Sequence, residues 1–328
     1  MKIASQSILR GVGIYAPPKI LDNAQLEKMV DTNDEWIVQR TGVRERHISA
    51  PDEFASHMGI KAVEDLVASC NIPVDDVDLI ILTTFTPDHF SPHTAALVQG
   101  HFGMKNCGTM DLGAGCTGFT YALCTADALV TMGRFKKVLV VTSETISKVT
   151  DYTDRKTCIL FGDAATACVV ERAEAGSPGA FYGSTFSTDG ELAENVMRSG
   201  LSDDVHGVCA LKPGFFQQDG QNVFKYVIRK IPKGIDALLA QTGLTFKDID
   251  WFIPHSANMR IIDSLADKIG FPLERTLTSV EQFGNTSTSS IPLALWRGLK
   301  ESKVKKGDLL MFYGFGGGLT HGGTIVRW

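Results

Sequence analysis

Residues 111–122 read DLGAGCTGFTYA and place one cysteine, Cys116, after a run of small residues. The small residues predict a tight turn leaving a strand, and the apolar residues after Cys116 predict a buried helix. A cysteine at such a turn lies where helix N–H groups point, so we expect a stabilised thiolate and a lowered pKa. The alternative is a small buried hydrophobic residue, which describes most cysteines of intracellular proteins.

The overall composition is that of a globular chain. Of its 328 residues, 44% are hydrophobic and 21% are charged, and the net charge is −5. This length allows two domains or one large fold made of two halves. No window reaches the ~18 apolar residues of a membrane span, and no run of Lys and Arg stands out. We therefore expect neither a membrane nor a nucleic acid among the partners.

The cysteines indicate a reducing compartment. There are seven of them, an odd number, and none form a C-x-x-C pair, so the sequence predicts neither a disulfide framework nor a zinc site. The N-terminus lacks the apolar run and small-residue cleavage site of a signal peptide. We expect a cytoplasmic protein with reduced thiols and no bound metal.

Predicted strands and helices alternate along the chain. Strands are expected at residues 8–15, 78–84, 137–142, 166–171, 250–253 and 309–313, and helices at 23–30, 56–69, 94–102 and 290–300. Asn23 is expected to cap the first helix. A glycine pattern of the dinucleotide-binding type at residues 11–16 precedes two prolines where a helix is required, so we discount it. The alternation predicts an α/β fold with parallel or mixed sheets.

The second half of the sequence repeats the first at a nearly constant offset. Residues 75–81 parallel 247–253 at an offset of 172 (250 − 78), and a later pair of strands matches at 171 (309 − 138). Such spacing indicates a duplicated unit, which we divide into residues 1–175 and 176–328. At this offset the Cys116 turn corresponds to residues 285–288. We expect the two turns to face one cleft where the halves meet.

Two further polar residues occupy positions where function is common. His255 follows the strand at 250–253, and strand ends line the crevice of open α/β sheets. Asn285 precedes the helix at 290–300. Each residue also has a structural explanation, as a buried hydrogen-bonded histidine and as a helix cap. Glycines at 314–318 would let backbone N–H groups approach a ligand.

These residues alone leave three classes of function open. A cysteine protease would use the histidine to activate the thiol and the asparagine to orient the histidine, but the residues flanking Cys116 lack the known protease patterns. A dinucleotide enzyme would rest on two weak glycine motifs. A non-catalytic acyl-binding protein is the third class, and labelling of Cys116 by an acyl-CoA would exclude it.

The chain resembles the 3-oxoacyl-(acyl-carrier-protein) synthase III family over nearly its whole length. The motifs that carry this resemblance are DTNDEWIVQRTGVRERHI (31–48), GCTGFTYAL (115–123), DYTDR (151–155), FGDAA (161–165), PHSANMRII (254–262), FGNTS (283–287) and FGGGLT (315–320). The resemblance implies a thiolase-like αβαβα five-layer fold, built from two duplicated halves, and a homodimer.

The implied reaction is the decarboxylative condensation of an acyl-CoA primer with malonyl-acyl-carrier-protein. Its products are 3-oxoacyl-acyl-carrier-protein, CoA and CO2, and it initiates fatty acid biosynthesis. The CoA thioesters are substrates, so no cofactor is implied. The alternative on this scaffold is a related acyltransferase or condensing enzyme of secondary metabolism that uses the same cysteine.

The resemblance also assigns roles to individual residues. Cys116 is the implied acyl-accepting nucleophile, His255 and Asn285 are the decarboxylation pair, and the N–H groups of Cys116 and Gly317 form the oxyanion hole. The implied CoA contacts are Trp36, Arg40, Arg155, Gly220, Phe224 and Asn258. Ser256 and Arg260 are the implied contacts to the carrier protein, and Phe90 is implied to close the acyl pocket across the dimer. Many members have glutamine at Ser256 and an aromatic residue at His321, so acyl preference is left open.

Overall fold

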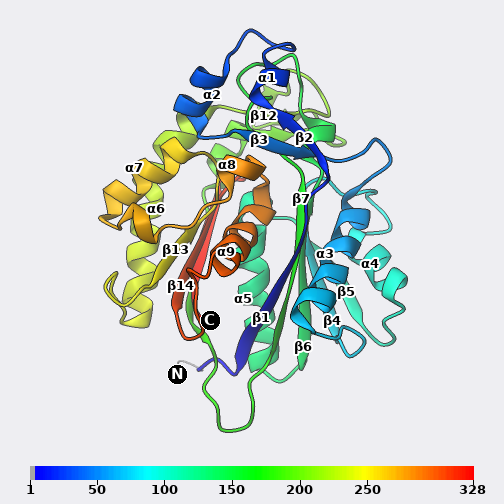
Figure 1. The fold of residues 1–328 in the computed structure, drawn as a ribbon, viewed down its shortest axis with the longest axis vertical. Coiled ribbons are helices and arrows are strands. Elements are labelled where there is room, and N and C mark those ends of the chain that lie inside the picture. The colour runs from blue at the N-terminus through cyan, green and yellow to red at the C-terminus, as the bar shows by residue number, and fades with distance from the viewer. Residues whose placement is uncertain (1–3) are drawn as a thin grey trace.

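The computed structural model describes residues 4–328 and has five layers, with two large β-sheets separated by a central layer of helices (Figure 1). The first sheet has the order β1-β7-β6-β4-β5. Its strands are β1 (Ser7–Tyr15), β4 (Leu79–Thr83), β5 (Gly108–Leu112), β6 (Lys137–Glu144) and β7 (Ala164–Arg172). The second sheet has the order β13-β14-β15-β8. Its strands are β8 (Phe181–Thr188), β13 (Trp251–Pro254), β14 (Leu309–Gly316) and β15 (Thr320–Arg327).

The two sheets share one topology, as the sequence repeat predicts. In both, two neighbouring strands are parallel (β4 with β6, β13 with β14), and the next two pairings are antiparallel. The first sheet continues into β5 through a parallel pairing. The second has at this place only a single parallel bridge between Phe252 and Thr276. The chain therefore contains two copies of one unit, and the second copy is shortened at one edge.

Helices cover both faces of each sheet. The central layer holds α5 (Gly118–Thr131) and α9 (Ser290–Lys300) (Figure 1). The outer face of the first sheet is covered by α3 (Ala55–Cys70) and α4 (Thr94–Phe102). The outer face of the second is covered by α6 (Gly220–Thr242) and α7 (Met259–Ile269). Because both faces of each sheet are covered, the central strands are apolar without alternation, and every residue of β4 and β6 is buried.

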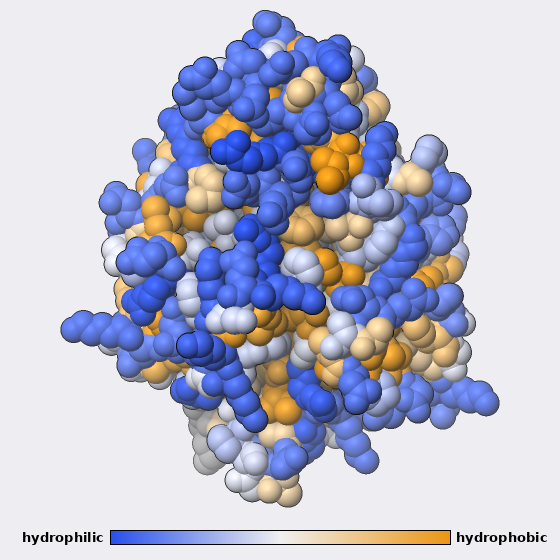
Figure 2. All heavy atoms as spheres, in the orientation of Figure 1, coloured by the Kyte–Doolittle hydropathy of each residue, from blue (hydrophilic) through white to orange (hydrophobic). Residues whose placement is uncertain are grey.

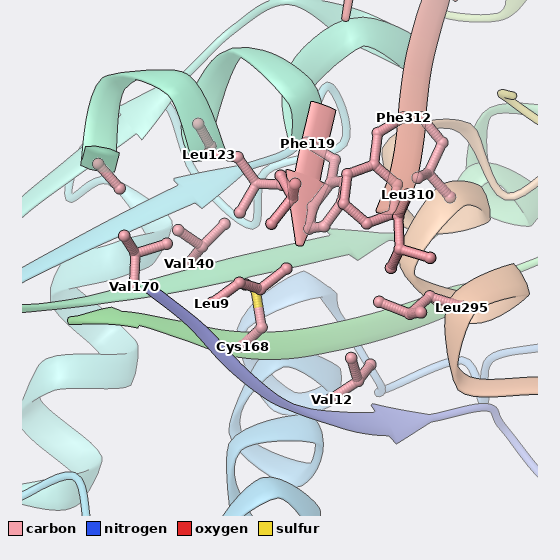
Figure 3. Close-up of a cluster of buried hydrophobic side chains, with 14 of the residues drawn as sticks. Leu9, Val12, Phe119, Leu123, Val140, Cys168, Val170, Leu295, Leu310 and Phe312 are labelled. Carbon is pink, nitrogen blue, oxygen red and sulfur yellow. The ribbon is translucent and has the colours of Figure 1, made fainter. Parts of the chain in front are cut away.

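The core of the central layer joins the two halves. Figure 3 shows Phe119 and Leu123 of α5 between strands of the first sheet and Leu310 and Phe312 of β14. Phe119 and Phe312 meet edge to face, with their ring centroids 5.8 Å apart. Such pairs add about 0.5–1.5 kcal/mol to the stabilisation from burial alone. The two halves are therefore held together by a continuous apolar core.

Short elements cap one end of the molecule, at the top of Figure 1. They include β2 (Lys19–Asp22), α1 (Asn23–Leu26), α2 (Asp34–Thr41), β3 (Glu45–Ile48), β9 (Val196–Arg198) and β12 (Phe216–Gln218). Other short elements, not all of them at this end, are β10 (Asp204–Val205), β11 (Val208–Cys209), α8 (Val280–Phe283) and the 3-10 turns η1 (Gly115–Thr117), η2 (Ile146–Val149), η3 (Gly190–Asn195), η4 (Leu273–Arg275) and η5 (Ser287–Ser289).

The predicted cap of the first helix is wrong. Asp22 is the cap, because its carboxylate accepts the N–H of Gln25 at 2.8 Å. The side chain of Asn23 turns inward, where it donates to Asp34 at 2.7 Å and accepts from Arg46 at 2.6 Å. The helix is also shorter than predicted and ends at Leu26.

The glycine pattern at residues 11–16 has no helix after it, as expected. Gly11 lies in a bulge of β1 with φ of 60°, and β2 follows directly. The face of the molecule drawn in Figure 2 is largely polar, with apolar side chains in small separate groups. Among residues 4–328, none of the helices has the length and hydropathy to cross a bilayer.

Candidate active site

The cysteine turn and its repeat lie against each other at the centre of the molecule. Cys116 lies in η1, which leads into α5, and Ser287 begins η5, which leads into α9. The two turns correspond at an offset of 172 (287 − 115) and pack together. Gly115 and Ser287 also share a left-handed backbone, with φ of 48° and 50°. The expected meeting of the two turns is confirmed.

The end of β14 packs against the Cys116 side chain. A Cβ atom built on Gly316 would lie 2.9 Å from Cys116 Sγ. The N–H of Gly317 is near enough to the sulfur to lower the pKa of the thiol. This position, beside the N–H of Cys116 itself, is the one expected for an oxyanion hole.

The predicted lowering of the Cys116 pKa is wrong for this state of the protein. Although the residue is partly exposed, burial of the sulfur raises the pKa of the thiol to about 11, against the lowering effects of Ser287 and the Gly317 N–H. The negative charge of Glu144 raises it further. Cys116 also lies in η1, before α5 begins at Gly118, and so is not in the first turn of that helix. The thiol therefore needs a way to lose its proton when it reacts.

His255 is buried at the end of β13 and is held as a neutral ring. Its Nδ1 lies 2.7 Å from Ser290 Oγ, which also accepts the N–H of Ser256 at 3.2 Å. Because the ring also donates to the Ser287 carbonyl, a neutral ring carries its proton on Nε2, and Nδ1 accepts the Ser290 hydroxyl. Burial lowers the pKa of His255 to about 3, while the Ser287 carbonyl raises it. The ring is thus a neutral N–H donor at neutral pH.

Asn285 is buried, and its amide is oriented by the turn that follows it. Its backbone bridges to the segment around Phe161 through hydrogen bonds to Leu160 and from Gly162. Its Oδ1 accepts the N–H of Ser287 at 2.9 Å, which leaves the NH2 group to donate to a ligand. Asn285 does not cap α9, whose N-cap is Ser289.

Ser287 links the three predicted residues. Its N–H binds Asn285, its carbonyl raises the pKa of His255, and its hydroxyl lowers the pKa of the Cys116 thiol. The structure therefore brings Cys116, His255 and Asn285 into one cluster. Sequence reasoning included Ser287 in a motif but gave it no role, because a left-handed serine leaves no signal in the residue pattern.

A second group of predicted residues lies in the capping elements. The Arg155 guanidinium stacks over the Trp36 ring at 4.8 Å, and that of Arg40 lies 5.9 Å from the same ring. Arg155 also pairs with the exposed Asp31 at 3.3 Å. Trp36, Arg40 and Arg155 therefore lie together. Arg155 is in direct contact with Trp36, however, and a flat ring could stack between these two side chains only if they stood about 7 Å apart, twice the contact distance of carbon atoms.

The third group lies where α6 and α7 begin. Gly220 is the first residue of α6, Phe224 is one turn further on, and the exposed Arg260 of α7 lies over the Phe224 ring at 5.7 Å. Asn258 caps α7 by accepting the N–H of Ile261 at 2.9 Å.

Ser256 does not fit its predicted place in a protein interface. It is fully buried, and its hydroxyl accepts the N–H of Ser279 at 3.0 Å. It supports the His255 strand end instead. The other two residues singled out lie apart from the cluster: Phe90 is 85% exposed, and the buried His321 binds the Tyr313 hydroxyl at 2.9 Å.

Two family models match the chain. One is described as 3-oxoacyl-[acyl-carrier-protein] synthase III and matches residues 110–190, and the other describes its C-terminal part and matches residues 239–328. Beta-ketoacyl-[acyl-carrier-protein] synthase III 2 of Halalkalibacterium halodurans is 50% identical over 99% of this chain and 97% of that protein. The chain belongs to the 3-oxoacyl-[acyl-carrier-protein] synthase III family.

Other members of the synthase III family agree in sequence and in fold. The Bacillus subtilis protein of the same name as the Halalkalibacterium one is 47% identical over 99% of each chain. The crystal structure of beta-ketoacyl-[acyl carrier protein] synthase III from Thermus thermophilus superposes with a TM-score of 0.93. It is 39% identical, and the match covers 98% of this chain and 99% of that one. The enzyme is thus a condensing acyltransferase with the thiolase-like five-layer fold.

Proposed function

We propose that this enzyme condenses an acyl-CoA primer with malonyl-acyl-carrier-protein, with loss of CO2, and so initiates fatty acid biosynthesis. The observation that carries the proposal is the cluster around Ser287, which holds Cys116 beside two neutral donors, His255 and Asn285. The names of the relatives, which are beta-ketoacyl-acyl-carrier-protein synthases, support it.

In the first half-reaction, Cys116 attacks the thioester carbonyl of the acyl-CoA. The acyl group moves to the sulfur and CoA leaves. The N–H groups of Cys116 and Gly317 stabilise the tetrahedral oxyanion, and one such donor is often worth ~3 kcal/mol.

In the second half-reaction, malonyl-acyl-carrier-protein loses CO2 and leaves an enolate on its thioester oxygen. The Nε2–H of His255 and the NH2 group of Asn285 donate to that oxygen. Because burial holds His255 neutral, it presents no cation that would stabilise the malonyl carboxylate in the ground state. The enolate then attacks the acyl-Cys116 carbonyl to form the 3-oxoacyl product.

The binding roles follow the three groups of residues. Trp36 and Arg155 hold the CoA adenine after Arg155 moves off the Trp36 ring, and Arg40 holds the phosphate end. Gly220, Phe224 and Asn258 line the approach to Cys116. Arg260, exposed at the start of α7, attracts the acidic carrier protein.

We further propose that the enzyme is a cytoplasmic homodimer. All seven cysteines are free thiols, which fits a reducing compartment. β5 is an edge strand whose residues are exposed or partly exposed, and an open edge is a place for strand pairing between chains. In such a dimer, Phe90 closes the partner's acyl pocket, and its 85% exposure in the single chain supports this role.

The proposal is tested by separating the half-reactions in His255→Ala and Asn285→Ala. Both variants should still accept labelled acyl groups on Cys116, because neither residue touches the acyl-CoA carbonyl in this scheme. Both should lose release of CO2 from malonyl-carrier-protein. Cys116→Ala should lose acylation itself. Decarboxylation at the parent rate in either donor variant would contradict the assigned roles.

A further inference from the structure

Two threonine hydroxyls join the cysteine turn to the glycine turn after β14, and the reaction described above assigns them no role. Thr117 is the last residue of η1, directly after Cys116, and Thr320 is the first residue of β15. Their Oγ1 atoms lie 2.7 Å apart. Thr117 is fully buried and Thr320 is partly buried. The contact therefore connects the two copies of the repeat through residues 203 positions apart in the chain.

Thr117 holds the turn that contains the Cys116 N–H. Its Oγ1 donates to the Ala114 carbonyl at 2.5 Å, and its own N–H donates to the same carbonyl at 3.1 Å. The peptide bond between Gly115 and Cys116 lies inside this turn, and Gly115 has a left-handed φ of 48°. The two hydrogen bonds therefore fix the direction in which the Cys116 N–H points.

Thr320 holds the glycine turn in a similar way. Gly316 of β14 pairs with Thr320 of β15, so the three residues 317–319 connect the two strands. Two of these three are glycines, whose backbone is the least restricted of any residue. The Thr320 hydroxyl donates to the Gly317 carbonyl at 2.9 Å. This bond restrains the residue whose N–H is the second proposed donor of the oxyanion hole.

The two turns are also in close contact through their backbones. A Cβ atom built on Gly115 would lie 3.8 Å from the Gly317 nitrogen, and one built on Gly316 would lie 2.7 Å from Cys116 Cβ. Such packing brings the two N–H groups near each other. Packing is not directional, however, whereas a hydrogen bond depends on the angle at its proton. The orientation of the two N–H groups therefore depends on the hydroxyl contacts.

The two hydroxyls act as one unit because they share their protons. Thr117 and Thr320 have one hydroxyl proton each, yet they make three short contacts, two to carbonyls and one to each other. One proton is therefore shared between a carbonyl and the neighbouring hydroxyl. Removal of either hydroxyl changes the hydrogen bonding of both turns.

We propose that Thr117 and Thr320 are positioning residues that hold the two N–H groups of the oxyanion hole at the spacing that the tetrahedral intermediate requires. The inference rests on the proposed roles of Cys116 and Gly317. A donor stabilises an oxyanion well only when it already points to the place where the charge develops, so that nothing has to reorganise during the reaction. The two donors belong to different copies of the repeat, and the hydroxyl pair connects them. Each threonine acts through the backbone of its own turn.

The test replaces each threonine by valine, which keeps the shape of the side chain and removes the hydroxyl. The variants should fold, because the backbone bond from residue 117 to Ala114 and the pairing of residue 320 with Gly316 remain. Single-turnover transfer of a labelled acyl group from acyl-CoA to Cys116 should slow about tenfold in each, since a misdirected donor costs less than the ~100–1000-fold of a missing one. Thr117→Ser and Thr320→Ser keep the hydroxyl and should acylate at the parent rate.

Alkylation of Cys116 by iodoacetamide separates a role in the oxyanion hole from damage to the nucleophile. The same sulfur then attacks a saturated carbon, so no tetrahedral oxyanion forms. The alkylation rate should therefore stay at the parent value in Thr117→Val and Thr320→Val. Equal losses in alkylation and acylation would overturn the assignment to the oxyanion hole. So would parent acylation in either valine variant, or failure of the serine variants to restore it.

The double variant with valine at both positions tests whether the two hydroxyls act together. Removal of the second hydroxyl should add little, so the double variant should acylate about as slowly as each single one. Independent hydroxyls would instead multiply their losses to about 100-fold (10 × 10). That outcome would overturn the proposal that they form one unit.

A matched control is Thr83→Val. Thr83 and Thr288 form a second hydroxyl pair between the two copies, also 2.7 Å apart, and both residues are buried. This variant should acylate at the parent rate, and slowing equal to that of the Thr117 and Thr320 variants would overturn the specific role of their pair. Absence of label on Cys116 in the parent enzyme would instead refute the proposed function. Normal label in the parent and in both valine variants refutes the positioning role alone.

Discussion

Replacing Gly316 by alanine should damage acylation through contact with the nucleophile alone. An ideal Cβ at this residue would lie 2.7 Å from Cys116 Cβ and 2.9 Å from Sγ. Ordinary contact begins at 3.4 Å, so the sulfur must shift by about 0.5 Å (3.4 − 2.9). The φ of Gly316 is not in the left-handed region, so backbone strain adds nothing to the effect.

A misplacement of about 1 Å can cost ~100-fold in rate, so half of it should cost about tenfold in acylation. The crowding should also destabilise the fold by about 1–3 kcal/mol, which is a fall of a few degrees in Tm. The assays are single-turnover acylation of Cys116 and thermal unfolding. Gly100→Ala is the control, because its new Cβ meets no atom of residues 4–328 within 4 Å and the substitution favours helix α4. Parent acylation in Gly316→Ala would refute the packing of β14 on the sulfur.

Three other predictions follow from the same geometry. Arg155→Ala and Trp36→Ala should raise the KM for acyl-CoA more than they lower kcat, since stacking far from the reacting bond is uniform binding; CoA binding at parent strength in calorimetry would contradict the placement. Arg260→Glu should raise the KM for malonyl-carrier-protein and spare acylation, and high salt should have the same effect on the parent; a KM unchanged by either treatment would count against this docking site. Below pH 6.5 His255 takes up a proton in the unfolded state, whereas in the folded state it does so only near pH 3. Acidification over this range therefore lowers the free energy of unfolding by up to ~1.4 kcal/mol per pH unit. His255→Gln should therefore gain stability relative to the parent in urea unfolding as the pH falls from 6.5, and parallel curves would refute the burial of a neutral ring.

The sequence predicted the architecture because burial leaves strong patterns. The fully buried strands β4 and β6 contain the apolar runs Leu79–Leu82 and Val138–Val141, and the duplication offset correctly predicts that η5 lies against η1. The boundary at residues 175 and 176 stays a prediction, although it falls between β7 and β8. Patterns of this kind report which residues are inside, but they do not report which atoms face each other.

The errors in the site come from that difference. A lowered Cys116 pKa was expected from the turn alone, whereas burial of the sulfur outweighs the nearby N–H groups. Ser256 is polar, yet it faces inward between two buried residues, because its hydroxyl binds the Ser279 backbone.

The central layer of helices makes the reaction dependent on both copies of the repeat at once. Cys116 stands before α5 of the first copy, whereas His255 and Asn285 come from the second, and the apolar core between the sheets holds the two copies together. Neither copy expressed alone contains a working centre. Catalytic activity followed along a denaturation curve therefore measures how well the two copies remain docked, and it should be lost with the central core, before either sheet comes apart.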